Sequence, residues 1–423
     1  MRLRILPTIA LALLGLACSE PDGSYSDPGR YEFSDPNDPS AELYDTRNLV
    51  RFDIEIPDES LDNLDSDPRE YTPATLRYRG ETLSNVGVRL KGEYSFRKMS
   101  GKPAFKLKFD KFVKGQRFRG LKRMTLNNNV QDPSMLSQPL SYELFRAADL
   151  PAPRASNVLV YVNGEYYGVY SNVETEDKVF LSRWFSSNDG NLYEENLVDF
   201  LPGNASVFDL ETNKKRNDRS DLEALIRAID ESSPDDFYEK VGQELDMPQY
   251  LRYVAVEALV GGWDGYSYGV GSRNNFRVYR DPSIDKFVLL PWGLDRGLRP
   301  RLDPLQYHDW IGEVEVSHQS LWEAHGVLLE RCIASPRCKQ AFVDTVEEMM
   351  SLFESLNLAN KARTDFARLR DAAYADDRKE EDNEYLEYAL ELLTGYVDSR
   401  PGSIREDLAE PGGACIQQRM FVG

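Results

Sequence analysis

The chain has 423 residues, of which 41% are hydrophobic and 29% charged, a composition typical of an ordered globular protein and not of a disordered one. Its 71 acidic and 51 basic residues give a net charge of −20, which would repel a phosphate backbone and argues against a nucleic-acid partner. A nucleotide is not excluded, because local basic residues or a divalent metal can reverse the field within one cleft. The length allows two or three domains or one two-lobed unit.

The N-terminus has the pattern of an export signal. Met-Arg-Leu-Arg precedes an apolar run over residues 5–17 and then Cys18, and this run is shorter than the roughly 20 residues that a spanning helix needs. The segment Leu-Gly-Leu-Ala-Cys resembles a lipobox, in which the cysteine is acylated. We therefore expect residues 1–18 to be a lipoprotein signal that anchors the chain through Cys18, with ordinary secretion as the alternative.

The residues after the signal predict a tether and a location. Residues 19–48 are rich in Asp, Pro, Ser and Gly, as in a flexible linker, so the folded part is expected to begin near Leu49. No Asp directly follows the cysteine to favour retention at an inner membrane. We therefore expect an outer-membrane or cell-surface lipoprotein.

From residue 49 to about residue 126, short segments with apolar residues at alternate positions predict a β-rich region. Asp132 followed by Pro133 then predicts a helix start, with the helix covering about 133–148. The dipeptide Asn163-Gly164 lies between two runs of strand-forming residues and predicts a β-hairpin with a type I′ turn.

The second half of the chain is predicted to be mainly helical. Ser220 and Glu223 have the spacing of a capping box ahead of an apolar helical pattern. A helix is expected from Asp246 to about Val260, followed by a strand pair over 276–280 and 286–290, and the periodicity of 320–408 is helical. A β-rich region followed by a helical one predicts an α+β fold of two lobes with a cleft between them, and a hinge between residues 174 and 220.

Two cysteines in the helical half predict a disulfide. Cys332 and Cys338 are six positions apart with Pro336 between them, and an exported chain favours their oxidation. A zinc site would need more ligands than the three scattered histidines provide. Cys415 has no partner that the sequence indicates.

The strongest chemical signal lies around the strand pair of the second half. Asp264 follows Gly-Gly-Trp, Asn275 precedes the first strand, and Asp295 follows Pro-Trp-Gly-Leu after the second. Carboxylate and amide oxygens are the ligands that Mg²⁺ or Mn²⁺ prefers. Phosphoryl transfer needs such a metal, a positioning carboxylate and a lysine on the phosphates. Glycine-loop, zinc-protease and serine-hydrolase signatures are absent from the sequence.

The order of several short segments resembles the spore coat protein H kinase-like family, an atypical branch of the protein-kinase fold. The resemblance covers about residues 49–298. The matching segments are 88–92 (Val-Arg-Leu-Lys-Gly), 102–109, 126–128, 150–154, 162–170 with Glu174, then Asp264, Asn274, Asn275, Tyr279 and 291–295 (Pro-Trp-Gly-Leu-Asp).

This resemblance implies an ATP-dependent protein kinase with a β-rich N-lobe and a mainly helical C-lobe. It places the kinase-like domain at 49–300, with the N-lobe over about 49–200 and the C-lobe core from about 220. A helical C-terminal part of the C-lobe would follow at 301–410, and a tail at 411–423. The implied activity is Mg²⁺- or Mn²⁺-dependent phosphorylation of Ser or Thr in proteins of the envelope or surface.

The resemblance also assigns roles to single residues. Asp264 takes the catalytic-loop position and Asp295 the metal-binding one, with Asn275 as a second ligand. Trp292 would stack on adenine. In the first lobe Lys106 is predicted to contact the phosphates, with Lys102 and Lys108 as alternatives. Glu174 is predicted to be its ion-pair partner, and Arg89 and Lys91 are predicted to be further phosphate contacts.

Other interpretations of the same residues remain open. The family usually reads Pro-Trp-Asp-Leu-Asp, and Gly293 replaces the first Asp, which favours a catalytically silent pseudokinase with a structural or adhesive role. A metal-dependent phosphohydrolase would use the same ligands but leaves the first-lobe lysines unexplained. The structural alternatives are a helix-terminating turn at Asp264, an ion pair of Asp295 with a neighbouring arginine, core packing of Trp292, and a solvated surface at Lys106 and Glu174.

Overall fold

The first part of the chain forms a closed β-barrel. The computed structural model describes residues 37–269, 271, 273–300 and 319–410. Alternating buried and exposed residues along the strands place one face of each strand in the barrel core. The β-rich prediction is confirmed, and helix α1 (Asp58–Ser66), which was not expected, connects the first two strands. In spatial order the barrel strands are β1 (Val50–Glu55), β2 (Thr72–Tyr78), β3 (Glu81–Lys91), β4 (Ala104–Lys108), β5 (Arg123–Asn127), β7 (Glu165–Val173) and β6 (Ala155–Val162).

The predicted hairpin is the β6–β7 pair. Asn163 and Gly164 have φ values of 50° and 84°, so both are left-handed, as a type I′ turn requires. The Asn163 side chain also accepts from the Ile56 amide at 2.7 Å. The turn is therefore fixed both by its own residues and by contact with the end of β1.

Helix α2 (Ser137–Ala147) begins four residues later than Asp132-Pro133 predicted. The Asp132 carboxylate accepts from the Ser134 hydroxyl at 2.5 Å and from the Ser137 amide at 2.8 Å. Met135 has a φ of 62°, which a continuous helix excludes. Asp132 therefore organises a turn ahead of the helix instead of capping it directly.

The described end of the predicted tether is packed against the barrel. Residues 41–44 form a 3-10 helix, Ala41–Tyr44, and Leu43 is fully buried. Asp38 is buried and accepts from Arg154 at 2.5 Å and from Arg183 at 3.1 Å. The folded part thus begins before Leu49, because an acidic and an apolar side chain within the Asp- and Pro-rich stretch find buried partners.

A second, four-stranded sheet lies beside the barrel. Its order is β11 (Lys286–Pro291), β10 (Phe276–Asp281), β8 (Leu192–Glu194) and β9 (Asp209–Leu210). The predicted strand pair is confirmed as β10 and β11. The short strands β8 and β9 follow helix α3 (Lys178–Trp184) and belong to this sheet, whereas the last barrel strand in the chain, β7, ends at Val173.

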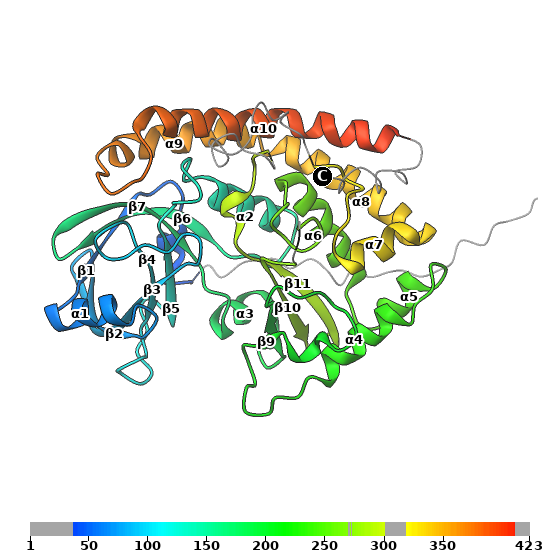
Figure 1. Ribbon diagram of the computed structural model, residues 1–423, viewed down its shortest axis with the longest axis horizontal. Coiled ribbons are helices and arrows are strands. Elements are labelled where there is room, and N and C mark those ends of the chain that lie inside the picture. Colours follow the sequence, from blue (N-terminus) through cyan, green and yellow to red (C-terminus); the bar gives the residue numbers. More distant parts are fainter. Residues whose placement is uncertain (1–36, 270, 272, 301–318, 411–423) are drawn as a thin grey trace, which may run out of the picture.

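Helices form most of the second part (Figure 1), and this prediction is confirmed. Helix α6 starts after Asp246, whose side chain accepts from the Gln249 amide. The predicted capping box is not formed, because Ser220 is the first helical residue and its amide donates to Asp218. The helices are α4 (Ser220–Asp230), α5 (Phe237–Val241), α6 (Met247–Val260), α7 (Val327–Ala334), α8 (Pro336–Ser355), α9 (Leu358–Tyr374) and α10 (Asn383–Ala409).

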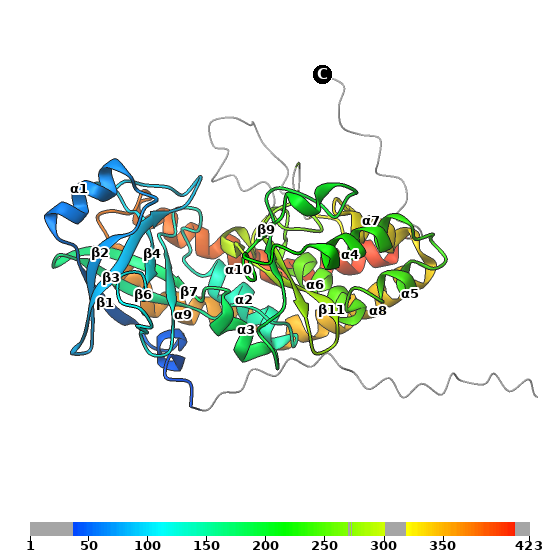
Figure 2. The same cartoon turned by 90° about the horizontal axis from the view of Figure 1, so that it is seen from below.

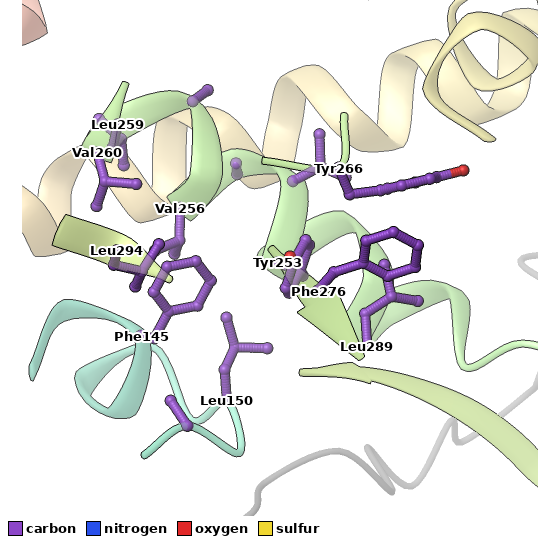
Figure 3. Packing of buried hydrophobic residues seen from close by; sticks show 14 of the residues in the cluster. Phe145, Leu150, Tyr253, Val256, Leu259, Val260, Tyr266, Phe276, Leu289 and Leu294 are labelled. Atoms are coloured by element: carbon purple, nitrogen blue, oxygen red, sulfur yellow. The ribbon is translucent and has the colours of Figure 1, made fainter. Parts of the chain in front are cut away.

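The largest apolar core lies between α2, α6 and the second sheet. Figure 3 shows Phe145 of α2 beside Val256 of α6 and Leu294, and Tyr266 beside Phe276 of β10. The predicted disulfide is present: Cys332 and Cys338 are bonded at 2.08 Å and are fully buried at the α7–α8 junction. In the described part of the chain, no helix combines the length and apolarity needed to cross a membrane.

The C-terminal helices reach both parts of the molecule. Helices α9 and α10 run along one side, past the barrel and the helical part (Figures 1 and 2). In the turn between them, Asp376 accepts from Lys102 of the barrel at 2.5 Å, and both side chains are almost fully buried. Arg378 donates to the Gly101 carbonyl at 2.7 Å. The α9–α10 turn therefore ties the first lobe to the C-terminal helices.

Candidate functional site

Three basic side chains lie together on one face of the barrel. Arg89 on β3 is the register partner of Lys106 on β4, and Lys91 lies two residues further along β3. Alternate residues of a strand share a face, so these three side chains are neighbours. Lys108 shares this parity, whereas Lys102 is buried in its ion pair with Asp376 and is thereby excluded from phosphate contact.

Burial lowers the pKa values of Lys91 and Lys106. Burial, followed by the Lys91 and Arg277 charges, lowers the pKa of Lys106 to about 7. Burial also lowers the pKa of Lys91 to about 8, against an opposing attraction from Asp295. The Lys91 ammonium donates to Asn127 Oδ1 at 2.5 Å. Lys106 makes no ion pair within 4 Å among the described residues, so its charge is available for an anionic ligand.

Asp264 lies in the loop that follows α6. Gly261 ends the helix in the left-handed conformation, with φ of 71°. The Asn275 side-chain amide donates to the Asp264 main-chain oxygen at 2.8 Å and to its carboxylate at 3.0 Å. Burial raises the pKa of Asp264, the Arg296 charge opposes this, and the Asp295 charge adds to it. The structure therefore brings two of the predicted metal ligands, Asp264 and Asn275, into direct contact, and the Asp295 charge acts on Asp264.

Asp295 lies in the 3-10 helix Leu294–Arg296 directly after β11. Its charge influences both Asp264 in the second lobe and Lys91 on the barrel. Arg299 donates to the Asp295 main-chain oxygen at 3.3 Å. Among the described residues the Asp295 carboxylate has no ion pair within 4 Å.

The donor set suits a hard divalent cation. Among the described residues, no three His, Cys, Asp or Glu side chains are grouped as a complete metal cage. Two carboxylates, Asp264 and Asp295, and the Asn275 carboxamide are instead present. Mg²⁺ is usually held by one or two carboxylates together with substrate phosphates, so these residues fit it when a nucleotide supplies the remaining oxygens.

Gly293 leaves the space that Asn275 fills. Gly293 has a φ of 61°, and a Cβ added there would lie 2.1 Å from Asn275 Oδ1. The position at which the family usually has a first Asp is therefore occupied by a neighbouring carboxamide. A cavity of about 20 Å³ adjoins these two residues and Asp264.

Glu174 does not pair with Lys106. It accepts from Arg154 at 2.9 Å and also bonds Arg183, in the buried cluster that holds Asp38. This cluster explains why Glu174 is buried and assigns it to the packing of the N-terminal segment. The predicted ion pair of Glu174 with the phosphate-binding lysine is corrected accordingly.

Glu194 on β8 is the acidic residue that faces Lys106. The charges of the two residues influence each other across the lobes. Burial raises the pKa of Glu194, but Arg277 and Lys106 lower it overall. Sequence reasoning missed Glu194, since β8 has only three residues. Its one sequence signal is the Glu194-Glu195 pair next to an aromatic residue.

Arg277 on β10 pairs with two acidic residues, Glu176 and Glu194. It bonds Glu176 and donates to Glu194 at 2.6 Å. Its guanidinium lies 4.5 Å from the ring centroid of Trp292. Trp292 is partly exposed, with part of its ring packed against the core. The adenine-stacking role of Trp292 stays a prediction.

Glu195 holds the main chain of Asn275. Its carboxylate accepts from the Asn275 amide at 2.7 Å. Burial and the neighbouring Glu194 raise the pKa of Glu195 to about 8. This bond holds the left-handed backbone of Asn275, whose φ is 56°, and thereby orients the carboxamide toward Asp264.

Comparison with known proteins identifies the family. The sequence model described as CotH kinase protein matches residues 76–404, most of the chain. The chain belongs to the CotH kinase family. It is 22% identical over 387 residues to inner spore coat protein H of Bacillus subtilis, covering 86% of this chain and 98% of that protein. This membership confirms the family that the sequence motifs indicated and identifies the chain as kinase-like.

Two fungal proteins and one solved structure are also similar to this chain. Invasin CotH2 of Rhizopus delemar is 24% identical over 256 residues, which covers 56% of this chain and 42% of that protein. Invasin CotH3 of the same organism is 24% identical over 176 residues, covering 37% of this chain and 28% of that protein. The Helicobacter pylori proinflammatory kinase CtkA is similar in structure with a TM-score of 0.32 and 10% identity, over 80% of this chain and 90% of that chain.

Proposed function

We propose that this CotH family member is an ATP- and Mg²⁺- or Mn²⁺-dependent protein kinase that phosphorylates Ser or Thr of envelope or surface proteins. The observation that carries this proposal is the opposition of two charge groups. Lys91, beside Lys106 on the barrel, is attracted by the charge of Asp295 on the second lobe, where Asn275 bonds Asp264. A triphosphate with its metal has the charge distribution to fill the space between them.

Each group has a distinct part in the proposed reaction. Asp264, Asn275 and Asp295 would hold the metal, which supplies neutralisation of charge on the transferring phosphate. Lys106, whose charged form is favoured by the Glu194 charge, would bind phosphate oxygens, with Lys91 and Arg89 as further contacts. Asp264 would orient the substrate hydroxyl and take its proton as the new O–P bond forms and the bond to the ADP oxygen breaks.

The location of the protein is proposed from the sequence. The signal-like residues 1–18, which lie outside the described ranges, support export and acylation at Cys18. Anchoring there would place the kinase domain at an outer membrane or cell surface, next to envelope proteins. Metabolic labelling with a fatty-acid analogue, with Cys18→Ser as the comparison, tests this: label lost in C18S supports the anchor, and label retained contradicts it.

A catalytically inactive pseudokinase with a structural or adhesive role is the second candidate. Gly293 favours it, because one carboxylate of the usual family pattern is missing. The arrangement of Asn275 in that space supports a site that binds a nucleotide weakly or without transfer.

Titration calorimetry with ATP, with and without Mg²⁺ or Mn²⁺, separates the two. The variants are Asp295→Asn and Asp264→Asn, and Asp371→Asn is the control because its side chain is 96% exposed. In a kinase ATP binds only with metal, and D295N and D264N both weaken this binding because each removes a metal ligand. Phosphoryl transfer, followed by mass spectrometry, stops in both variants. Absence of binding with either metal contradicts the kinase proposal.

A further inference from the structure

The loop that carries Asp264, here called the aspartate loop (residues 261–267), is wrapped around one buried carboxylate. The Ser267 amide donates to both carboxylate oxygens of Glu257, at 3.2 and 3.1 Å. A Cβ on Gly265 would lie 2.1 Å from Glu257 Oε1, and one on Gly262 would lie 2.5 Å from Glu257 Cγ. The two glycines therefore let the loop backbone close around the side chain of Glu257.

Glu257 itself lies on the last turns of α6 and is 2% exposed. Among the described residues it has no ion pair within 4 Å, and Arg273 is the cation that influences it electrostatically. Its remaining titratable neighbours are three buried tyrosines, Tyr250, Tyr253 and Tyr268. A buried carboxylate is costly unless hydrogen bonds compensate it, and here the loop amides are the groups that do so.

The other side of the aspartate loop is held by the C-terminal helix α10. Arg400, fully buried, donates to the Ala258 carbonyl through Nε at 3.0 Å and Nη2 at 2.8 Å. The Tyr396 hydroxyl donates to the Leu259 carbonyl at 3.2 Å. A helix leaves its last carbonyls without partners inside the helix, so these two side chains complete the end of α6 where the loop begins.

Tyr396 also contacts the first residue of the loop. A Cβ on Gly261 would lie 2.5 Å from the Tyr396 hydroxyl oxygen. The left-handed turn at Gly261 is therefore closed against α10, whereas Glu257 fixes residues 262–267 from within. Asp264 lies between these two attachments, and its own side chain reaches the Asn275 amide.

We propose that Glu257 and the α10 residues Tyr396 and Arg400 are positioning residues that hold the aspartate loop in the geometry needed for phosphoryl transfer. The inference rests on the proposed kinase function for its catalytic consequence. The C-terminal helices are then a required support of the site, although no residue of α10 contacts Asp264 in the described structure. Glu257 and α10 act on opposite sides of the same five-residue turn from Gly261 to Gly265.

Hydrogen exchange of residues 261–267 tests the proposal without relying on activity. Tyr396→Phe removes one hydroxyl and Glu257→Gln replaces one acceptor oxygen by a donor. Tyr166→Phe is the matched control, because the Tyr166 hydroxyl donates to the Ala372 carbonyl far from the loop in sequence. We expect exchange in the loop to be faster by about tenfold in E257Q and Y396F, and unchanged in Y166F.

Steady-state kinetics of the same variants then test whether the loop geometry matters for phosphoryl transfer. A misplaced Asp264 lowers kcat by about tenfold to a hundredfold, with a smaller effect on KM for ATP because Asp295 and the barrel lysines still contact the nucleotide and its metal. The inference is overturned if hydrogen exchange of residues 261–267 in both E257Q and Y396F equals that of the wild type. It is also overturned if exchange is faster but kcat is unchanged. If the wild-type protein transfers no phosphate, the proposed function fails while the exchange result still decides whether Glu257 and α10 hold the loop. Y396F keeps the test decisive if E257Q does not fold.

Discussion

Gly293 and Asn275 share one space: the carboxamide oxygen of Asn275 lies where a side chain at position 293 would begin, 2.1 Å from an ideal Cβ. The departure from the usual family pattern is thus matched by the position of a second residue. The site has one carboxylate fewer and a carboxamide in its place, which lowers its negative charge; the carboxamide nitrogen donates to Asp264 and the oxygen lies at Gly293.

Gly293→Ala should therefore disturb the site beyond the cost of its backbone conformation. A left-handed glycine replaced by alanine loses about 1 kcal/mol of stability from backbone strain alone. At Gly293 the added Cβ also displaces the Asn275 carboxamide. Gly203→Ala is the control, since Gly203 has φ of 90° and open space around it. Urea unfolding and ATP titration should show a larger loss of stability and weaker metal-dependent binding in G293A; equal losses in stability and unchanged ATP binding would contradict the displacement.

Lys106→Met should stabilise the free protein at neutral and lower pH while removing nucleotide binding. The pKa of Lys106 is lowered from 10.5 to about 7, so between these values the unfolded chain binds a proton that the folded chain does not. The free energy of unfolding contributed by Lys106 therefore rises with pH from about 7 to about 10.5. The gain from K106M should be largest below pH 7 and disappear near pH 10.5.

Thermal unfolding at several pH values, in the wild type, K106M and Lys108→Met, measures this dependence. Lys108 shares the strand but is less buried, so its variant should show a smaller effect. A gain in stability that is independent of pH would show that packing, and not the buried charge, is responsible. Because ATP favours the charged form of Lys106, its binding near pH 8 should take up protons, which calorimetry in buffers of different ionisation enthalpy detects.

Glu174→Gln and Glu194→Gln should separate stability from nucleotide binding. Removing one member of a buried ionic cluster costs about 3 kcal/mol, so E174Q, which weakens the bonds to Arg154 and Arg183, should unfold at lower urea concentration and bind ATP normally once folded. E194Q should weaken ATP binding, because Lys106 loses a carboxylate charge that favours its ammonium form. The opposite pattern would restore Glu174 as the partner of the phosphate-binding lysine.

Loss of the disulfide should lower stability without changing the site. The bond between Cys332 and Cys338 closes a loop with a sequence separation of 6, which corresponds to about 2 kcal/mol in the chain-entropy treatment. The double variant C332A/C338A should therefore show a lower midpoint of urea unfolding and unchanged ATP affinity. A change in affinity would indicate that the α7–α8 junction influences the aspartate loop.

Local sequence signals predicted much of the fold. Asn163-Gly164 predicted its hairpin because two left-handed residues determine the turn by themselves. Asp246-Met247-Pro248 predicted the start of α6 for a similar local reason. The helix start predicted at Asp132-Pro133 was wrong, because the same residue types can also form a turn. The turn forms here because Ser134 and Ser137 donate to the Asp132 carboxylate.

The sequence predicted the site residues that lie in recognisable loop motifs. It did not predict the ion-pair partners that come from distant segments of the chain. Asp264, Asn275 and Asp295 come from three segments that the family resemblance already placed together, and the structure brings them together. The partner of Lys106 depended on β8, a three-residue strand without a detectable pattern. Glu174 was misassigned because its arginine partners and Asp38 come from distant segments, and no local rule relates them.

The ion pair between Lys102 and Asp376 joins residues separated by 274 positions. At synthesis rates of about 5 to 20 residues per second, the barrel strand next to Lys102 leaves the ribosome roughly 15 to 55 s before its partner exists. During that interval the lysine must stay hydrated, which keeps this edge of the barrel from closing. Completion of the first lobe would then wait until the last two helices have been synthesised.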